Sequence, residues 1–445
     1  MAWTVDQVLG LAPDSSAAQG GRSLASLRKW VQAAQTEGAI WGECQGSGVQ
    51  PYRTVIDLGG PAFKCGCPSR KFPCKHALGL FLVYASNAAD LAVLEPPAWA
   101  SEWLANRLAR ADQEKQREEQ PAAAVDPARA AAEQQKRAQR RDQRVRAGID
   151  DLERWLEDVA RAGLTDLAGR PRAYFDHMAA RLVDAQAPGL ARRVRWLSVL
   201  PHTGSRWPER MLIELGRLEL LLEAYRRIDT LDDRLRADVR TQVGFADSRE
   251  DILAGPAVAD TWSVLSRRVV GEERLRVQRT WLWGADSGGW VLVLDFAAGP
   301  QQSLDQTLVP GTRVEAEACL YPGASPTRAL LKGPPRIAGV VKAVPASSTE
   351  LALRSYAEAL ARNPWLERFP MAVGPVIPRR SAQDSWCLVD DAAARVPIEG
   401  PAGWHLLALS GGHPISVFGE WDGFSLWPLA ALVEHGFAPL TVAAA

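Results

Sequence analysis

The chain has 445 residues and carries 52 Lys or Arg against 52 Asp or Glu, so its formal net charge is zero. A neutral chain has no overall field that attracts nucleic acid or anionic lipid, so binding of either would need a local patch. At roughly 150 residues per domain the length predicts two to four domains, and no apolar run reaches the ~18 residues of a membrane-spanning helix.

The first part of the chain predicts a helix followed by three strands. An apolar stripe with helical spacing predicts the helix over residues 23–35. Short runs of apolar and β-branched residues predict strands at 40–44, 52–58 and 62–65, with a Gln-Gly-Ser-Gly turn after the first.

Four potential metal ligands follow the third strand. Three of the six cysteines and one of the six histidines, namely Cys65, Cys67, Cys74 and His76, fall within twelve positions. Thiolate sulfur and imidazole nitrogen, four donors in all, are the ligands of a closed tetrahedral zinc site. An apolar stripe with helical spacing begins at Lys75, which places the last two ligands at the start of a helix. The sequence therefore predicts a structural Zn²⁺ site in a small strand–loop–helix module.

Three other interpretations of the cysteine–histidine cluster compete with a structural zinc site. Free thiols in a small core are one, although core packing gives cysteines no reason to gather at this spacing. A redox pair of Cys65 and Cys67 is another, but such pairs generally have two residues between the cysteines. A catalytic zinc needs water in place of one ligand, and no Glu or Asp lies between Leu58 and Ala89 to serve as a base.

Basic residues surround the cluster, with only Asp57 as a nearby acid. They are Arg53, Lys64, Arg70, Lys71 and Lys75. Lys and Arg beside cysteines stabilise the thiolate form. The same residues could instead contact the phosphates of a nucleic acid or a partner protein. Both interpretations stay open at the level of sequence.

The cysteine–histidine pattern resembles the SWIM zinc finger. The resemblance covers residues 38–87 and rests on the Cys-x-Cys and Cys-x-His pairs, on Pro68, and on the Lys-His-Ala-Leu sequence that enters the helix. Residues 41–48, 51–52, 67–76, 405–414 and 419–423 are also similar to a bacterial branch of stand-alone SWIM zinc finger proteins. The resemblance implies bound zinc and a DNA- or protein-binding role. It further implies AAA-type ATPases or von Willebrand A-type proteins as partners, and no particular reaction.

A polar segment follows the zinc module. Residues 101–146 are rich in Ala, Gln, Glu and Arg, which predicts a flexible linker or a solvated helix. Its last part, 136–146, has six basic residues and one acid. We interpret this part as the exposed face of a helix, with a contact to nucleic acid or an acidic partner as the alternative.

The remaining periodicities predict three further units. Residues 147–245 have helical spacing and predict a bundle, residues 246–345 alternate as strands and predict an antiparallel sheet or barrel, and residues 346–445 mix both periods. With residues 1–100 as the zinc module, this gives four domains and one linker. In the last unit we expect a helix at 349–362, strands at 386–390, 395–398, 404–409 and 415–418, and a terminal helix at 426–435.

Templates of common enzymes are missing from the sequence, including the phosphate-binding P-loop, the dinucleotide glycine motif and the nucleophile elbow. One constellation, His413 with Glu420, Trp421 and Asp422, is expected on paired turns where a ligand could bind. Ordinary hairpin chemistry is the alternative. Cys319 falls on the charged phase of its strand, which predicts an accessible thiol.

We therefore expect an α+β, multidomain protein with a small ββα-like zinc module, a helical middle section and an antiparallel β-rich C-terminal half. The favoured function is a non-enzymatic, zinc-dependent adaptor for protein partners. DNA binding through the basic residues near the finger is the second hypothesis, and an enzyme at the C-terminal turns is the third. Clustered thiols and an N-terminus without an export signal predict a cytoplasmic location, and no membrane partner is expected.

Overall fold

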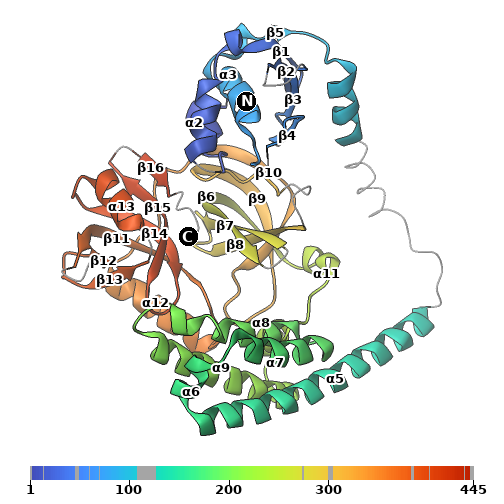
Figure 1. Cartoon of the computed structure of the whole chain (residues 1–445), viewed down its shortest axis with the longest axis vertical. Helices are drawn as coiled ribbons and strands as arrows, with labels where there is room; N and C mark the ends of the chain where they lie inside the picture. The colour runs from blue at the N-terminus through green and yellow to red at the C-terminus, as the bar shows by residue number, and fades with distance from the viewer. Residues whose placement is uncertain are drawn as a thin grey trace.

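The computed structural model shows four folded units along the chain (Figure 1). A β-barrel lies in the centre, with the N-terminal module at one end, the helical bundle at the other and a C-terminal sheet at its side. No helix among the residues described is both long and apolar enough to cross a bilayer. The described residues are 3–13, 15–45, 50–59, 61–69, 71–107, 127–272, 275–298, 304–381, 385–399, 401–434 and 436–440.

The N-terminal module is a five-stranded sheet covered on one face by helices. The sheet has the order β4-β3-β2-β1-β5. Its strands are β1 (Trp30–Thr36), β2 (Ala39–Cys44), β3 (Tyr52–Asp57), β4 (Ala62–Cys65) and β5 (Ala92–Val93), and its helices are α1 (Val5–Leu9), α2 (Ser15–Ser23) and α3 (Lys75–Ser86). Ile40, Ile56 and Phe63 of the sheet pack against Leu78 and Phe81 of α3. The predicted β2, β3, β4 and α3 are confirmed.

The predicted helix over residues 23–35 is wrong, because a short 3-10 turn at Leu27–Lys29 is followed by strand β1 from Trp30. Its helical spacing is overridden by pairing with β2, which buries Trp30 and Ala34 and leaves Val31 64% exposed. The opposite face of the sheet carries Trp41, which packs against Trp99 from the helical residues 98–107.

The helical bundle begins earlier than the sequence predicts. Its helices are α5 (Pro127–Ala162), α6 (Leu164–Gly169), α7 (Arg172–Asp184), α8 (Pro188–Leu197), α9 (Trp207–Arg226) and α10 (Asp233–Val243). Because α5 is continuous, it crosses the expected boundary between linker and bundle, and its burial in the core starts at Val145. The part of the predicted linker at residues 108–126 lies outside the described residues.

Five strands form the closed barrel, as the alternation in this region predicts. A short helix, α11 (Arg249–Ala254), leads into β6 (Ala257–Glu272), β7 (Leu275–Gly284), β8 (Trp290–Ala298), β9 (Thr312–Leu320) and β10 (Arg328–Val340). The order around the barrel is β10-β8-β7-β6-β9, with only the β8–β10 pair parallel among these neighbours. The sequence does not predict β10, whose ladder is irregular between Lys332 and Arg336. Two prolines lie there, and proline cannot donate to a ladder.

The C-terminal unit is a six-stranded sheet with two helices. The strand order is β13-β12-β11-β14-β15-β16. The elements are α12 (Thr349–Arg362), β11 (Phe369–Arg380), β12 (Trp386–Val389), β13 (Arg395–Ile398), α13 (Ala402–Ser410), β14 (Ile415–Trp421), β15 (Leu426–Val433) and β16 (Gly436–Pro439). The predicted α12, β12, β13 and β14 are confirmed.

Two predictions for this unit are wrong. Residues 404–409 lie in helix α13 and not in a strand, and residues 426–433 form strand β15 and not a terminal helix. Both are short apolar runs, whose period does not distinguish a strand from a helix. Apolar residues occupy consecutive positions of β15 because the strand is buried on both faces. Leu426 faces the core of its own unit, and Leu429 faces the barrel. Residue 435 is outside the described residues.

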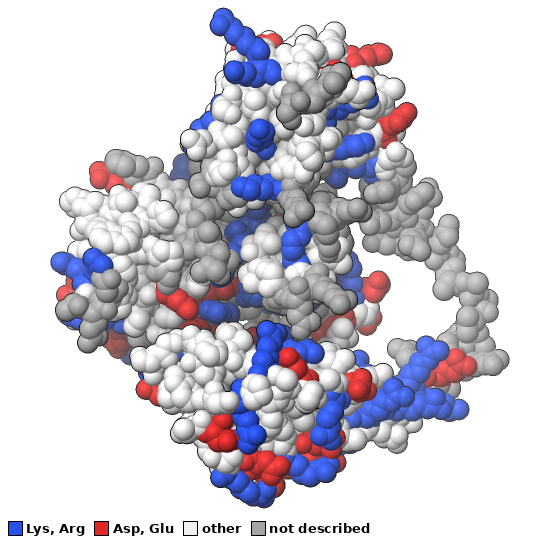
Figure 2. Space-filling view, in the orientation of Figure 1, with Lys and Arg blue, Asp and Glu red and all other residues white. Residues whose placement is uncertain are grey.

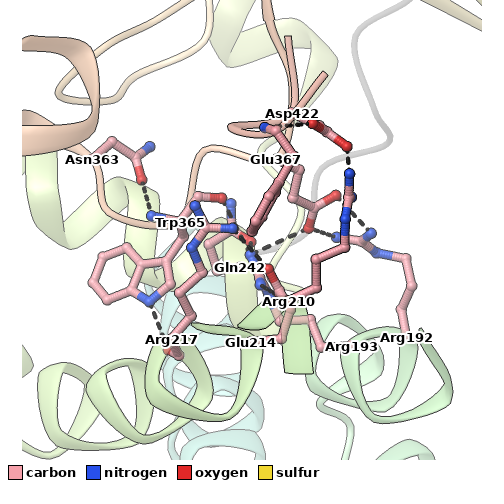
Figure 3. A network of polar contacts seen from close by, with 11 residues as sticks. Arg192, Arg193, Arg210, Glu214, Arg217, Gln242, Asn363, Trp365, Glu367 and Asp422 are labelled. Atoms are coloured by element: carbon pink, nitrogen blue, oxygen red, sulfur yellow. Dashed lines mark hydrogen bonds and ion pairs between the residues drawn. The ribbon is translucent and has the colours of Figure 1, made fainter. Parts of the chain in front are cut away.

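A buried polar network joins the bundle to the C-terminal unit (Figure 3). Arg193 of α8 is only 3% exposed, and its guanidinium donates to Gln242 at 2.7 Å and to the carbonyl oxygen of Trp365 at 3.3 Å. The Trp365 side chain, 1% exposed, packs in the bundle core and donates to the carbonyl oxygen of Arg217 at 3.0 Å. The segment between α12 and β11 therefore completes the core of the bundle.

Replacing Trp365 should destabilise the bundle although the residue lies far from it in sequence. We expect Trp365→Ala to lower the free energy of unfolding by about 3–5 kcal/mol, because it leaves a cavity in a packed core. Leu212→Ala is the matched control, since Leu212 is 64% exposed on α9 and its loss should change stability by less than about 0.5 kcal/mol. Denaturant unfolding followed by circular dichroism measures both, and equal effects would contradict this packing.

Candidate metal centre

The four predicted ligands come together at one end of the N-terminal module. One ligand atom from each of Cys65, Cys67, Cys74 and His76 lies within 4.8 Å of every other. Cys65 ends strand β4, and Cys67 follows it in the loop. Cys74 is the residue before α3, and His76 lies in the first turn of that helix. One continuous segment, from the end of β4 through a loop to the first turn of α3, thus supplies the whole cluster.

Backbone contacts hold this loop in place. The N–H of Gly66 donates to the carbonyl oxygen of Arg53 at 3.0 Å, which extends the β3–β4 ladder past Cys65. The carbonyl oxygen of Cys74 accepts from the N–H of Leu78 at 3.0 Å, so α3 starts at the third cysteine. Unpaired N–H groups at a helix start favour negative charge, which stabilises a thiolate there.

The cluster is partly shielded from solvent. Cys74 and His76 are 4% and 5% exposed, whereas Cys65 and Cys67 are half-buried. The hydroxyl of Thr54 donates to Sγ of Cys65 at 3.2 Å, which orients that sulfur from the neighbouring strand. Nδ1 of His76 lies 3.8 Å from the same sulfur, and the Tyr52 ring packs 5.0 Å from the imidazole.

Without a metal, the close sulfurs share their protons unequally. Hydrogen bonding with Cys67 and Cys74 raises the pKa of Cys65, and hydrogen bonding with Cys65 lowers the pKa of Cys67. Burial acts to lower the pKa of His76, but hydrogen bonds with Cys67 and Cys74 outweigh it and raise that pKa to about 9. A bound cation would favour the deprotonated form of these crowded thiol groups.

The donor set fits zinc. Three sulfurs and one imidazole nitrogen make up a complete tetrahedral shell, in which Zn²⁺ needs no water ligand. Two acids of the same sheet are engaged elsewhere: Glu43 pairs with Arg53 at 3.2 Å and Asp57 with Arg107 at 3.0 Å. The cluster is therefore a zinc site of the structural kind, and the ion would hold Cys65 at the strand end against Cys74 at the helix start.

A pocket of about 460 Å³ opens beside the cluster. Cys67 and His76 form part of its wall, together with residues of α2 and of the loop. Its other lining residues are Ser16, Ala17, Leu24, Cys44, Gln45, Tyr52, Pro68, Ser69, Lys71 and Lys75. The α2 side of this pocket is not predicted from the sequence, because Ser15–Ser23 contains no large apolar residue.

Two glycines set the position of α2 against α3 and so shape the pocket. A Cβ at Gly21 would lie 2.8 Å from Cβ of Leu78, and a Cβ at Gly79 would lie 2.5 Å from Cβ of Leu24. Both distances are shorter than van der Waals contact allows, so only glycine permits this close approach. The occurrence of glycine in both segments, at Gly21 and Gly79, is the sequence signal that could have indicated this close approach.

The basic residues predicted near the finger do not share one face. Lys71 and Lys75 are exposed and line the pocket. Arg53 and Lys64 are exposed on the strand positions that alternate with Thr54 and Cys65, so they belong to the opposite side of the sheet. Figure 2 accordingly shows separate basic side chains over this module. The fifth residue, Arg70, lies outside the described residues.

The predicted constellation near the C-terminus is divided between different environments. His413 is exposed in the turn after α13, whereas Glu420 is 3% exposed and bonded to Arg279 and Trp281. Asp422 pairs with Arg210 at 2.7 Å, and Trp421 is in the core of the C-terminal unit. The expected accessible thiol of Cys319 is a wrong prediction, because this side chain is fully buried.

Two family models match parts of the chain. The SWIM zinc finger matches residues 52–85, which contain all four ligands. The SWIM-associated four-helix bundle domain matches residues 140–243, which run from within α5 to the end of α10. No curated protein and no solved structure matches the chain.

Loss of one ligand should remove the metal and loosen the module. We expect Cys74→Ser to purify without stoichiometric zinc and to be cleaved faster by protease within the N-terminal module, because coordination contributes directly to folding. Cys387→Ser is the control, since Cys387 is a free, half-buried cysteine in β12. Elemental analysis and limited proteolysis measure the effects, and full zinc content in Cys74→Ser would refute the assignment.

Zinc affinity should rise with pH. Raised pKa values mean that Cys65 and His76 hold protons at neutral pH in the metal-free protein, and zinc must displace them. We expect affinity to increase with pH through the neutral range and to be still rising at about pH 9, because zinc must displace these protons until the pH exceeds the pKa values of both groups. Competition with a chelator at a series of pH values measures it, and an affinity independent of pH would contradict the geometry.

Proposed function

This chain is a SWIM zinc finger protein, and on that basis we propose that it is a non-enzymatic adaptor that docks a partner protein beside its zinc site. The pocket next to the cluster carries this proposal. Its wall includes Cys67 and His76, so its shape depends on the loop that the metal organises. Zinc then acts by positioning a binding surface.

The chemistry of the pocket favours a peptide segment with both apolar and acidic side chains. Leu24, Tyr52 and Pro68 supply apolar surface, and Lys71 and Lys75 supply positive charge. Aromatic and apolar anchors give most of the affinity of a protein interface, while charges at its rim set its orientation. AAA-type ATPases and von Willebrand A-type proteins are the partner classes we propose, from the resemblance of the finger region.

A structural role for zinc supports the non-enzymatic part of the proposal. The four protein donors are sufficient for a closed coordination shell, and a catalytic zinc keeps one position for water. Two carboxylates of the sheet, Glu43 and Asp57, are paired with arginines and do not line the pocket.

DNA binding is the second candidate function. The observation that favours it is the first half of α5, where Lys136, Arg137, Arg140 and Arg144 are exposed. Figure 2 shows basic side chains along this projecting helix. Such a helix would contact the phosphate backbone, which gives binding that weakens steeply as salt rises.

Crosslinking from the pocket tests the adaptor proposal. A photoreactive residue in place of Ser16 should capture a partner that is then identified and purified. We expect binding of the purified partner to weaken at least tenfold in Lys71→Glu with Lys75→Glu, because opposed charges become like charges. Binding should be lost in Cys74→Ser and retained in Arg53→Glu, since Arg53 belongs to the other side of the sheet.

Two results would sink the adaptor proposal. One is partner binding that survives loss of zinc and reversal of both lysines. The other is salt-sensitive binding of DNA that falls when Arg140 and Arg144 are replaced while no protein is captured, which would establish the second function.

A further inference from the structure

Two arginines face each other on the wall of the barrel. Arg268 of β6 and Arg279 of β7 are directly opposite in the antiparallel ladder. Like charges at opposed positions repel and destabilise a sheet. Arg268 stacks on the Trp427 ring of β15, 4.1 Å from its centroid, and Arg279 has a side chain that is 22% exposed. The pair therefore lies where the barrel meets the C-terminal sheet.

One carboxylate, Glu420, is bonded to Arg279 and interacts electrostatically with Arg268 and with a third arginine, Arg368. Glu420 of β14 accepts from Arg279 at 2.9 Å and from the Trp281 indole at 2.7 Å. Burial acts to raise the pKa of Glu420, but Arg279, Trp281 and Arg368 outweigh it and keep that pKa below its usual value. Arg368 and Arg279 in turn help burial to lower the pKa of Arg268, so the three guanidinium groups interact electrostatically.

Two of the three cations, Arg268 and Arg368, form no ion pair in the part of the chain that the structure describes. Nε of Arg268 and Nη1 of Arg368 are buried from solvent and form no hydrogen bond there. No carboxylate of the described residues lies within ion-pair distance of either side chain. Glu420 opposes this repulsion at Arg268 most strongly, and Glu399 opposes it more weakly.

The neighbouring acid cannot compensate the excess charge. Glu367, next to Arg368 in sequence, accepts from Arg192 at 2.6 and 2.9 Å and from Arg193 at 3.2 Å (Figure 3). Its two oxygens are thus committed to the bundle. The cluster of Arg268, Arg279, Arg368 and Glu420, which we call the arginine cluster, keeps an excess of two positive charges.

Uncompensated guanidinium groups at a partly buried site are unfavourable for the protein alone. They become favourable when an anion with several acceptor oxygens lies between them. The planar fork of arginine matches the oxygens of phosphate, and it binds them through paired, charge-assisted hydrogen bonds.

The barrel itself indicates the kind of molecule that carries the phosphate. Its strand order, β6-β7-β8-β10-β9 with β8 and β10 parallel, is the order of the oligonucleotide/oligosaccharide-binding fold. In that fold the second and third strands bind the ligand. Here these strands are β7 and β8, and the C-terminal sheet covers their apolar part around Trp281 and Leu292. Arg279 of β7 lies at the margin of the covered region.

We propose that the arginine cluster is a phosphate-binding site, which takes a phosphate group of a nucleotide or of a single-stranded nucleic acid. The site uses one arginine from each of β6, β7 and the segment before β11, so a bound phosphate ties the barrel to the C-terminal unit. It is separate from the zinc site and does not depend on the proposed adaptor role.

The test uses the full-length, zinc-loaded protein with three probes: inorganic pyrophosphate, a mononucleotide and a fluorescent single-stranded DNA oligonucleotide. We expect pyrophosphate to raise the melting temperature, because a ligand that binds only the folded state stabilises it. Anisotropy of the oligonucleotide gives the affinity at several salt concentrations. Response to the small anions alone assigns the site to a nucleotide, and response to the oligonucleotide as well assigns it to nucleic acid.

Two single variants and one control locate the binding. Arg268→Gln and Arg368→Gln should each weaken binding by about ten- to a hundredfold, since each removes a charged hydrogen bond to the ligand. Arg336→Gln should change nothing, because Arg336 is a 76% exposed arginine of the same barrel that pairs with Glu315.

Stability without ligand distinguishes a binding role from a structural one. In phosphate-free buffer Arg368→Gln should melt at the same temperature as the unmodified protein or higher, because it relieves repulsion. The proposal is overturned if none of the probes binds, if the control weakens binding as much as Arg268→Gln, or if Arg368→Gln melts lower without ligand and binds all three probes normally.

Discussion

Coordination by three cysteines and one histidine is the constraint on which the N-terminal module depends. The loop from Cys65 to His76 has little apolar side-chain surface of its own, yet it joins a strand edge to a helix start and forms one wall of a pocket. In a small module, where core burial is limited, metal binding contributes to folding directly. The pocket, the approach of α2 to α3 and the proposed docking of a partner all follow from the position of this loop.

The rest of the molecule is held together by different physics. The bundle, the barrel and the C-terminal sheet share buried groups: Trp365 completes the bundle core, and Trp290 of the barrel stacks on Phe418 of the sheet at 5.1 Å. Buried polar contacts run alongside, with Arg193 and Glu420 each bonded across a boundary. Because removing one partner of such a contact leaves a charge unpaired, these contacts fix the relative positions of the units more than they add stability.

The small number of carboxylates at these boundaries explains the charge of the arginine cluster. Glu367 is shared by Arg192 and Arg193, and Glu420 is bonded to Arg279 and Trp281, so both carboxylates join units. Arg268 and Arg368 form no ion pair among the described residues, and one buried nitrogen of each has no hydrogen-bond partner there. In the phosphate site that we propose, this junction between units also binds an anion, so ligand binding is linked to the assembly of the chain.

The sequence by itself determined the zinc site, because its four ligands lie within twelve residues and their spacing is a local property. It also determined most strands and helices with a clear period, such as α12 and β9. It did not determine α13 or β15, whose short apolar runs are compatible with both a helix and a strand. Nor did it determine β1, where pairing with β2 overrides a helical spacing. Only the tertiary structure placed Lys71 with Lys75 and away from Arg53. It alone brought Arg268, Arg279 and Arg368 around Glu420, because barrel closure and the packing of one unit on another are set by contacts between residues far apart in the chain.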